Sequence, residues 1–357
     1  MTPLTRHLAG LIAREGPISV ATYMSTALMH PEWGYYATRD PFGAAGDFVT
    51  APEISQMFGE LIGLWIAETW ASQGRPSPFA LVELGPGRGT LMSDLLRATR
   101  RVAPDFAAAA HLHLIEASPT LRALQREKLR DTDITWHASL DKVPDLPLLL
   151  IANEFFDALP VRQFVRSPQG WCERCIGLAG ESEPRFVFVA APEPLPETLI
   201  PETKRSAPVG SVVELCPAGE ALMEAIAARL QAQGGAALVI DYGTDEIGAT
   251  LQAVRHHAFH DPLVDPGSAD LTAHVDFSAL AHAADGAGAQ VSGPLTQGKF
   301  LERLGISARA AILKKNALLP ADIDTAHERL TSPAAMGTLF KVMAVMAKGA
   351  HAPAFDG

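Results

Sequence analysis

An acidic residue followed by three alternating glycines carries the clearest chemical meaning in this sequence. The apolar run Phe79–Leu84 predicts a buried strand that leads into them, and Thr90–Arg101 has the apolar spacing of a helix. Glycine has no Cβ atom, so the chain can turn sharply there and bring its backbone close to a ligand. The residues are Glu83, Gly85, Gly87 and Gly89. They predict a nucleotide-binding turn; a tight turn without a ligand is the simpler alternative.

The glycine spacing argues against two common nucleotide motifs. The order is G-x-G-x-G, whereas the dinucleotide fingerprint is G-x-G-x-x-G and the phosphate-binding loop ends in Gly-Lys-Ser or Gly-Lys-Thr. Neither pattern is met. A nicotinamide-dependent oxidoreductase is the alternative enzyme class, and the missing dinucleotide fingerprint argues against it.

Polar residues also follow the other apolar strands that the sequence predicts. Glu116 ends the strand His111–Ala117, and a carboxylate there can accept both hydroxyls of a ribose. Ser139 follows Ile134–His137, and the pair Asn153 and Glu154 follows Leu146–Ala152. This pair is placed to face the reacting part of a ligand. Alternatively, Asn153 caps a helix and Glu154 interacts favourably with the helix dipole.

A third set of polar residues lies in the loop 43–53, before the amphipathic helix Ile54–Ala71. Its glycines and proline break regular structure, while Asp47, Thr50 and Glu53 supply polar groups. The alternative is a surface connection that caps the following helix.

Two groups of residues raise the question of a metal, and neither predicts one. Cys172 and Cys175 form a C-x-x-C, but a closed zinc site needs four ligands and no second pair exists. Four histidines lie between residues 256 and 274, near two aspartates, in no standard ligand spacing. We expect a loop packed over the site instead, with one His or Asp hydrogen-bonded to substrate or core. These residues are His256, His257, His260, His274, Asp261 and Asp276.

The elements around these motifs predict an α/β protein. Strands and helices alternate from Phe79 to Ala152 and resume with the helix Ala218–Gln233 and the strand Ala236–Asp241. This order favours a parallel sheet covered by helices, with ligands beyond the carboxyl ends of its strands. The segment 161–216 instead shows the alternating pattern of antiparallel strands. Gln297–Lys314 is predicted to be one helix and Leu339–Met346 the last strand.

Composition narrows the partners and the compartment. The formal net charge is −11 and the pI about 5.5, so nucleic acid and anionic membrane surfaces are not expected as general partners. No run of about 18 apolar residues predicts membrane insertion. Three cysteines are too few for a disulfide framework, and Met1–Gly16 lacks the apolar core of a signal peptide. We therefore expect a cytoplasmic protein, although a processed organellar protein would show the same features.

Five segments together resemble the MidA-like family of class I S-adenosylmethionine-dependent methyltransferases, bacterial relatives of a mitochondrial complex I assembly factor. The glycine turn alone is common to many methyltransferases, but the combination is specific and spans nearly the whole chain. The segments are 46–62, 83–91, 152–160, Asp241-Tyr-Gly243 and 269–277.

The resemblance implies a Rossmann-like, seven-stranded, mostly parallel sheet. It implies a helical N-terminal cap over 1–75, a methyltransferase core over 76–160 and 217–350, an antiparallel β insertion over 161–216 and a tail over 351–357. It also implies S-adenosylmethionine as cofactor and, by extrapolation, arginine methylation of a protein such as a respiratory complex I subunit. A non-catalytic assembly chaperone that keeps the cofactor fold remains an alternative.

The resemblance also suggests roles for the residues above. If the methyl acceptor is a guanidinium, carboxylates are needed to hold its fork and to take up a proton during the attack, because its free pKa exceeds about 12. Catalytic candidates are Asp47, Glu53, Asn153 and Glu154, with His274 as a weaker choice. Candidates for cofactor binding are Glu83, Gly85, Gly87, Gly89, Glu116, Ser139 and Asn153.

Overall fold

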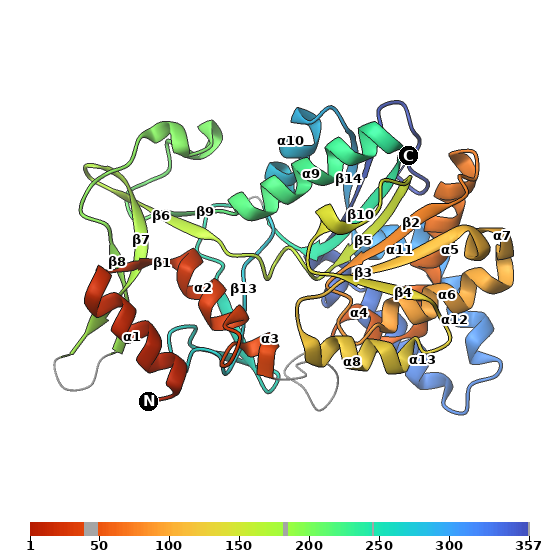
Figure 1. Ribbon diagram of the computed structural model, residues 1–357, viewed down its shortest axis with the longest axis horizontal. Helices are drawn as coiled ribbons and strands as arrows, with labels where there is room; N and C mark the ends of the chain where they lie inside the picture. The colour runs from red at the N-terminus through yellow and green to blue at the C-terminus, as the bar shows by residue number, and fades with distance from the viewer. Residues whose placement is uncertain (39–48, 181–184, 245, 356–357) are drawn as a thin grey trace. The chain divides into compact units, whose positions relative to one another are not determined.

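The computed structural model describes residues 1–38, 49–180, 185–244 and 246–355 (Figure 1). The chain divides into two compact units. The core unit comprises Val49–Phe156, Ala221–Gly243 and Phe277–Gly357. The insertion unit comprises Met1–Phe48, Asp157–Glu220 and Thr244–Asp276.

This division differs from the predicted boundaries at more than two places. The helix after residue 55 belongs to the core unit, and Thr244–Asp276 belongs to the insertion unit. The first difference has a packing reason, because the buried side chains of that helix, such as Phe58 and Trp65, share one apolar cluster with the central sheet.

The core unit contains a seven-stranded sheet in the order β14-β15-β10-β5-β2-β3-β4 (Figure 1). Strands β10, β5, β2, β3 and β4 are parallel to one another, while β15 is antiparallel to both β10 and β14. The predicted seven-stranded, mostly parallel sheet is therefore confirmed. The strands are β2 Phe79–Leu84, β3 Ala110–Ile115, β4 Ile134–His137, β5 Leu148–Asn153, β10 Gly235–Tyr242, β14 Gln290–Thr296 and β15 Phe340–Met346.

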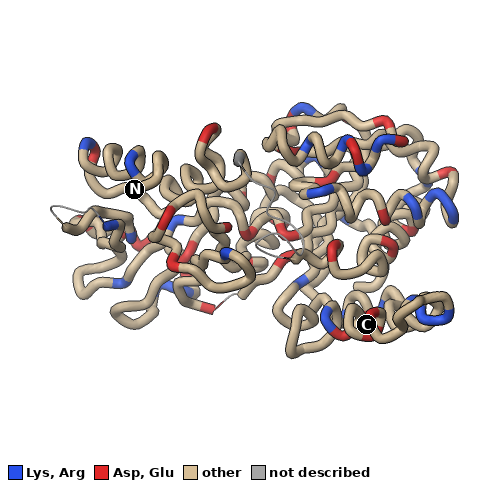
Figure 2. Tube along the Cα trace, turned by 90° about the horizontal axis from the view of Figure 1, so that it is seen from below, with Lys and Arg blue, Asp and Glu red and all other residues tan. Residues whose placement is uncertain are grey.

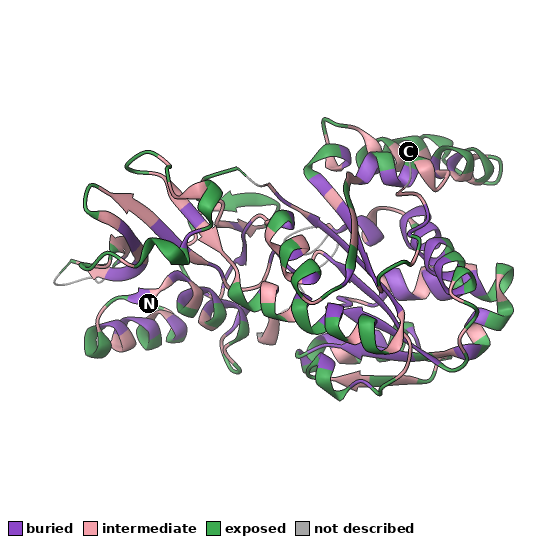
Figure 3. Cartoon of the chain, turned by 90° about the horizontal axis from the view of Figure 1, so that it is seen from above, coloured by how far each residue is buried: buried purple, intermediate pink, exposed green. Residues whose placement is uncertain are grey.

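The central strands are buried along their length, as near-continuous apolar runs predict. All six residues of β2 and of β5 are buried, and Figure 3 shows such buried strands in purple between helices with exposed outer faces. The helices associated with this unit are α4 Ala51–Ile54, α5 Gln56–Ser72, α6 Thr90–Val102, α7 Pro104–Ala109, α8 Pro119–Lys128, α9 Pro217–Gln233, α10 Phe277–Gly286, α11 Gln297–Arg303, α12 Ile306–Lys314, α13 Pro320–Thr331 and α14 Met336–Leu339, with a 3₁₀ turn η1 at Leu140–Lys142.

The insertion unit combines three N-terminal helices with two antiparallel sheets. One sheet has the order β1-β7-β6-β9, with β8 paired to β7, and the other has the order β12-β11-β13. Its elements are α1 Pro3–Glu15, β1 Ile18–Ser19, α2 Val20–Met29, α3 Tyr35–Thr38, β6 Arg162–Ser167, β7 Gly170–Ala179, β8 Arg185–Ala190, η2 Glu197–Leu199, η3 Glu202–Lys204, β9 Val212–Leu215, β11 Gln252–Arg255, β12 Ala258–His260 and β13 Asp270–Thr272.

The prediction of a loop across the histidine-rich segment is wrong, because β11, β12 and β13 form a small sheet there. His256 and His257 connect β11 to β12 with φ values of 50° and 60°. Two successive residues with positive φ are typical of the tight turn that joins two antiparallel strands. These two histidines therefore make a hairpin turn.

The single helix predicted over Gln297–Lys314 is also wrong. Gly305 has φ 87° and separates α11 from α12, so the chain changes direction within the apolar pattern. The mainly polar helix α13 was not predicted. Among the described residues, no helix has both the length and the apolar character needed to cross a membrane.

Candidate functional site

The glycine turn joins the end of β2 to the start of α6. Gly85, Gly87 and Gly89 have φ values of 57°, 52° and 78°, in the left-handed region that disfavours other residues. A Cβ atom on Gly85 would lie 2.8 Å from Cδ2 of Phe155. The turn thus lies directly before the amino end of α6, where a helix favours anionic or electron-rich ligand groups.

Glu83 lies under this turn with its carboxyl group buried. Its Oε2 atom has no hydrogen-bond partner within the described residues. Burial, and secondarily the negative charge of Glu116, raise the pKa of Glu83 to about 8. An unsatisfied buried carboxyl group is costly, so this position suits a ligand that brings a donor or a positive charge.

Glu116 follows β3 and is held in place by two donors. Its Oε1 atom accepts from the Ser118 backbone N–H at 2.8 Å, and Oε2 accepts from Nε2 of Gln125 at 3.2 Å. Burial raises the pKa of Glu116, although these hydrogen bonds oppose the shift. The carboxylate is therefore fixed at the carboxyl end of a strand next to β2, where a ribose would lie in related sheets.

Gln125 connects the glycine turn to Glu116, and sequence reasoning missed it. Its Nε2 atom donates to the Gly87 carbonyl at 2.7 Å as well as to Glu116, while its Oε1 accepts from Trp136 Nε1 at 2.8 Å. The side chain is completely buried on α8. Gln125 thus fixes the distance between two proposed cofactor contacts.

Asn153 and Glu154 stand at the end of β5 beside the glycine turn. No helix begins at Asn153, so the alternative reading of this pair as a helix cap is wrong. Asn153 Oδ1 is buried without a hydrogen-bond partner among the described residues. Glu154 has φ 50°, and its Oε1 accepts from the Ala51 N–H at 3.0 Å and from Asn153 Nδ2 at 3.2 Å. A strained non-glycine backbone at a ligand-facing position suggests a functional constraint.

Asp241, at the end of β10, shapes the segment that follows Glu154. Its Oδ2 atom accepts from the N–H groups of Phe155 and Phe156 at 3.1 and 3.0 Å, and its Oδ1 accepts from the Tyr242 N–H at 2.9 Å. Three hydrogen bonds donated to one buried carboxylate hold the chain in the turn that brings Phe155 against Gly85. Asp241 is therefore a positioning residue for the site.

Glu53 contacts the amino end of α6. Its Oε1 accepts a hydrogen bond from the Thr90 hydroxyl, and its Oε2 lies 3.9 Å from Nη1 of Arg88. Lys128 Nζ donates to the same Thr90 hydroxyl at 2.6 Å. The structure thus brings Glu53 to the glycine turn as a supporting side chain.

The outcome differs among the remaining predicted residues. Ser139 follows β4 at the edge of the sheet, is exposed, and donates to an Asp141 carboxylate oxygen. His274 belongs to the insertion unit, where its N–H donates to Oγ1 of Thr250 at 2.8 Å and burial lowers the pKa of its imidazole. Asp47 falls outside the described residues.

The cysteine pair lies on strand β7. Cys172 and Cys175 are both buried and free. Within the part of the chain that the structure describes, no group of three or more His, Cys, Asp or Glu side chains is arranged to hold a metal ion.

These residues fit S-adenosylmethionine. The glycine turn tolerates no Cβ at Gly85, because that atom would lie 2.8 Å from Phe155. Two buried acceptor atoms, on Glu83 and Asn153, have no hydrogen-bond partner among the described residues and suit a ligand that brings a donor or a positive charge. Glu116 presents a fixed carboxylate for hydroxyl groups. These acceptor groups therefore match a cationic nucleoside.

Comparison with known proteins supports this reading. Residues 61–295 match the model of a family described as "Putative S-adenosyl-L-methionine-dependent methyltransferase". The protein arginine methyltransferase NDUFAF7 of Mus musculus is 38% identical, covering 97% of this chain and 85% of that protein. The NDUFAF7 homolog of Drosophila melanogaster is 39% identical, covering 96% and 84%.

A solved structure agrees with the sequence relatives. A crystal structure from Burkholderia thailandensis bound to S-adenosyl-homocysteine is 31% identical, with a TM-score of 0.82, and covers 99% of this chain and 92% of that one. The chain belongs to this MidA-like family and is an S-adenosylmethionine-dependent methyltransferase.

Proposed function

We propose that this enzyme methylates an arginine side chain of a protein. The observation that carries the proposal is the carboxylate of Glu154, held with φ 50° at the end of β5 and oriented by the Ala51 N–H and the Asn153 amide. The relatives named protein arginine methyltransferase, at 35–39% identity over nearly the whole chain, support the choice of acceptor. A respiratory complex I subunit, which the family resemblance suggests, is the narrower form of this proposal.

Methyl transfer to arginine requires the chain to position the two reactants and to take up a proton. S-adenosylmethionine supplies a methyl group on a positively charged sulfur, so methyl transfer is an in-line displacement that depends on positioning. The attacking guanidinium nitrogen forms a bond to the methyl carbon as the sulfur–carbon bond breaks, and this nitrogen then loses a proton. In this proposal Glu154 aligns the guanidinium fork and accepts that proton. Glu53 holds the turn through Thr90 and Arg88.

The test measures methylarginine and cofactor binding separately. Purified protein is incubated with labelled S-adenosylmethionine and a host lysate, and labelled proteins are hydrolysed for amino-acid analysis. We expect methylarginine, and a loss of about 100-fold or more for Glu154→Gln, because the group that accepts a proton typically contributes that much. Calorimetry should show unchanged affinity of Glu154→Gln for S-adenosylhomocysteine. Glu302→Gln, an exposed carboxylate of the same unit, is the matched control.

Three results would contradict the proposal. Label on lysine or on a small molecule would replace the acceptor. Unchanged turnover of Glu154→Gln would remove that residue from the mechanism. Label no higher than that of Gly87→Val would favour an assembly chaperone that keeps the cofactor fold. The cytoplasmic location stays a prediction, to be checked by fractionating cells and locating the protein by immunoblot.

A further inference from the structure

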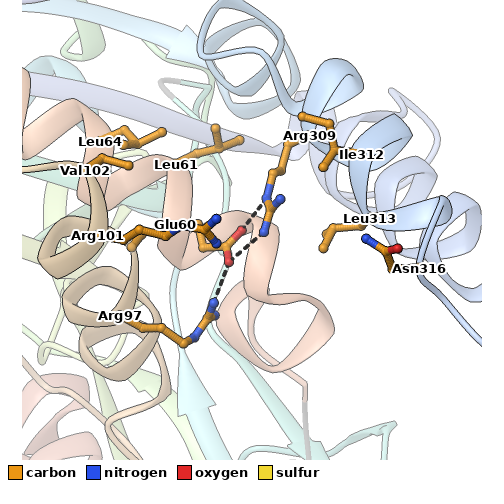
Figure 4. A pocket seen from close by; sticks show the side chains of 11 residues that line it. Glu60, Leu61, Leu64, Arg97, Arg101, Val102, Arg309, Ile312, Leu313 and Asn316 are labelled. Atoms are coloured by element: carbon orange, nitrogen blue, oxygen red, sulfur yellow. Dashed lines mark hydrogen bonds and ion pairs between the residues drawn. The ribbon is translucent and has the colours of Figure 1, made fainter.

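A hollow of about 690 Å³ lies on the core unit between α5, α6 and α12 (Figure 4). This size is in the range of ligand-binding clefts. No residue proposed to bind the cofactor lines it. The lining residues are Glu60, Leu61, Leu64, Arg97, Ala98, Arg101, Val102, Arg309, Ile312, Leu313 and Asn316.

The hollow lies far from the glycine turn. It contacts the last turns of α6, Arg97 to Val102, whereas the turn precedes Thr90 at the first residue of that helix. At about 1.5 Å per residue, Thr90 and Arg101 are roughly 16 Å apart along the axis. An occupant of the hollow would therefore act away from the methyl donor.

The walls of the hollow are apolar and partly exposed. Leu64, Val102 and Ile312 are 40%, 60% and 52% exposed, and each comes from a different helix. Single exposed apolar side chains are normal on a protein surface, but here three converge on one concave site. Leu318 and Leu319, which follow α12, are 100% and 65% exposed. A partner with its own apolar side chains would remove this surface from water.

The charged groups of the hollow are mainly cationic. Three arginines line it against one glutamate, although the chain as a whole carries a net charge of −11. Figure 2 marks in blue and red where the basic and acidic residues lie along the described trace. Glu60 accepts from Arg97 Nη1 at 2.7 Å and from Arg309 Nε at 2.7 Å, as the dashed lines in Figure 4 show. Arg101 is exposed, and its guanidinium forms no ion pair with the described residues. Arg101 is thus available to an incoming carboxylate.

We propose that this hollow, which we call the α5–α6–α12 groove, docks an acidic amphipathic helix of a partner protein. Apolar side chains at helical spacing would enter between Leu64, Val102 and Ile312, in the way that amphipathic helices fill grooves between helices. A Glu or Asp flanking them would pair with Arg101, and such charge complementarity selects against basic helices. The proposal is independent of which side chain the enzyme methylates.

The first experiment identifies what occupies the groove. The full-length protein is expressed in host cells with the photo-crosslinker p-benzoylphenylalanine in place of Val102, and in a control protein in place of Leu339, which is 47% exposed on α14. Crosslinked peptides are identified by mass spectrometry. We expect a segment at Val102 alone, with apolar residues at helical spacing and flanking acidic residues. A crosslink to a second copy of this chain, a crosslink to a lipid, or no product above the control would each overturn the proposal.

The second experiment tests the charge. The segment found is synthesised with a fluorophore, and its affinity is measured by anisotropy. Arg101→Glu should weaken binding at least tenfold, Val102→Asp should do the same, and Arg101→Lys should stay within about threefold. Affinity for S-adenosylhomocysteine should not change in these variants, which shows that they fold. Equal peptide affinity of Arg101→Glu and the wild type would overturn the proposal.

Discussion

Several residues of the cofactor site lower the stability of the protein in the absence of cofactor. Glu83 is buried with one oxygen lacking a hydrogen bond among the described residues, and three glycines hold left-handed conformations beside it. Such features persist where the surrounding structure determines them, and they concentrate at ligand sites. Their cost should therefore be visible in stability measurements.

Glu83 should make the protein less stable as the pH rises. In the unfolded chain its pKa is near the ordinary glutamate value of 4.5, and in the fold burial raises it to about 8. Between these values the unfolded state releases the proton while the folded state keeps it, so unfolding becomes more favourable with increasing pH. We expect the Tm of the wild type, without cofactor, to fall more steeply from pH 5 to pH 8 than that of Glu83→Gln. Parallel curves would show that Glu83 does not hold this proton.

Gly85→Ala should destabilise the protein and weaken cofactor binding. A left-handed conformation costs a non-glycine residue about 1–2 kcal/mol, and the new methyl group would also lie 2.8 Å from Phe155. Gly74→Ala is the matched control, since Gly74 has φ 85° and no atom within 4 Å of the added group. Urea unfolding should show a larger loss for Gly85→Ala than for Gly74→Ala, and calorimetry should show weaker S-adenosylhomocysteine binding only for Gly85→Ala. Equal losses of unfolding free energy in the two variants would mean that the Phe155 ring moves aside without a measurable cost.

Residue types and their places at strand ends made part of this site predictable. Glu83, the glycines, Glu116 and Asn153 each follow an apolar run, and the structure places them at the carboxyl edge of the sheet. Gln125 gave no such signal, because a glutamine inside a helix usually faces water. Its three hydrogen bonds depend on β4 and the glycine turn lying beside α8, which only the tertiary fold sets.

At the scale of elements, Glu60 joins three helices of the core unit. It lies on α5 and binds Arg97 of α6 and Arg309 of α12, with its own side chain only 6% exposed. Burial alone would raise the pKa of Glu60, but the hydrogen bonds and charges of the two arginines lower it. At pH values above the ordinary carboxyl pKa, the ionised Glu60 and its two arginines therefore stabilise the packing of these helices.

Glu60→Gln should lower the free energy of unfolding by about 2 kcal/mol at pH 7. Removing one partner of a buried ion pair typically costs more, but the arginines here are partly exposed and screened by water. Because the pKa of Glu60 is lowered in the fold, its contribution is lost as the pH falls through that pKa. The difference from the wild type in urea unfolding should therefore shrink as the pH is lowered below the ordinary carboxyl pKa. Glu302→Gln should stay within about 0.5 kcal/mol, and an equal effect of both variants would contradict a specific role for Glu60.

The parallel sheet was predictable because its strands are long, apolar and separated by helices. Strands β11, β12 and β13 were not, since they have only four, three and three residues and include charged or histidine side chains. Their turn, His256 and His257, lacks the glycine or asparagine that usually marks a positive φ. Tertiary contacts hold this small sheet. For example, the Glu214 carboxylate of β9 accepts from the N–H groups of Thr250 and Leu251, which lead into β11, at 3.0 and 3.1 Å.

At the scale of the whole molecule, every described cofactor candidate belongs to one compact unit. Glu83, the glycine turn, Glu116, Asn153 and Glu154 all lie in the core unit, whereas His274 and the small sheet lie in the insertion unit. A ligand stabilises what it contacts, by about 2.7 kcal/mol at a free concentration one hundred times its Kd. Cofactor binding should therefore stabilise the two units unequally.

Hydrogen exchange with and without S-adenosylhomocysteine measures this difference. We expect slower exchange in peptides covering residues 84–90, 115–118 and 152–156, because their backbone amides border the proposed site. Peptides from β7 in the insertion unit should exchange as before, since β7 carries no cofactor candidate. Slower exchange in β11 to β13 with no change at the glycine turn would contradict the prediction. It would place the cofactor in the insertion unit and remove Glu83 and Glu116 from its site. Protection of the glycine turn that disappears in Gly85→Ala would tie the effect to the backbone geometry of that turn, because this substitution changes its conformation and leaves the two carboxylates in place.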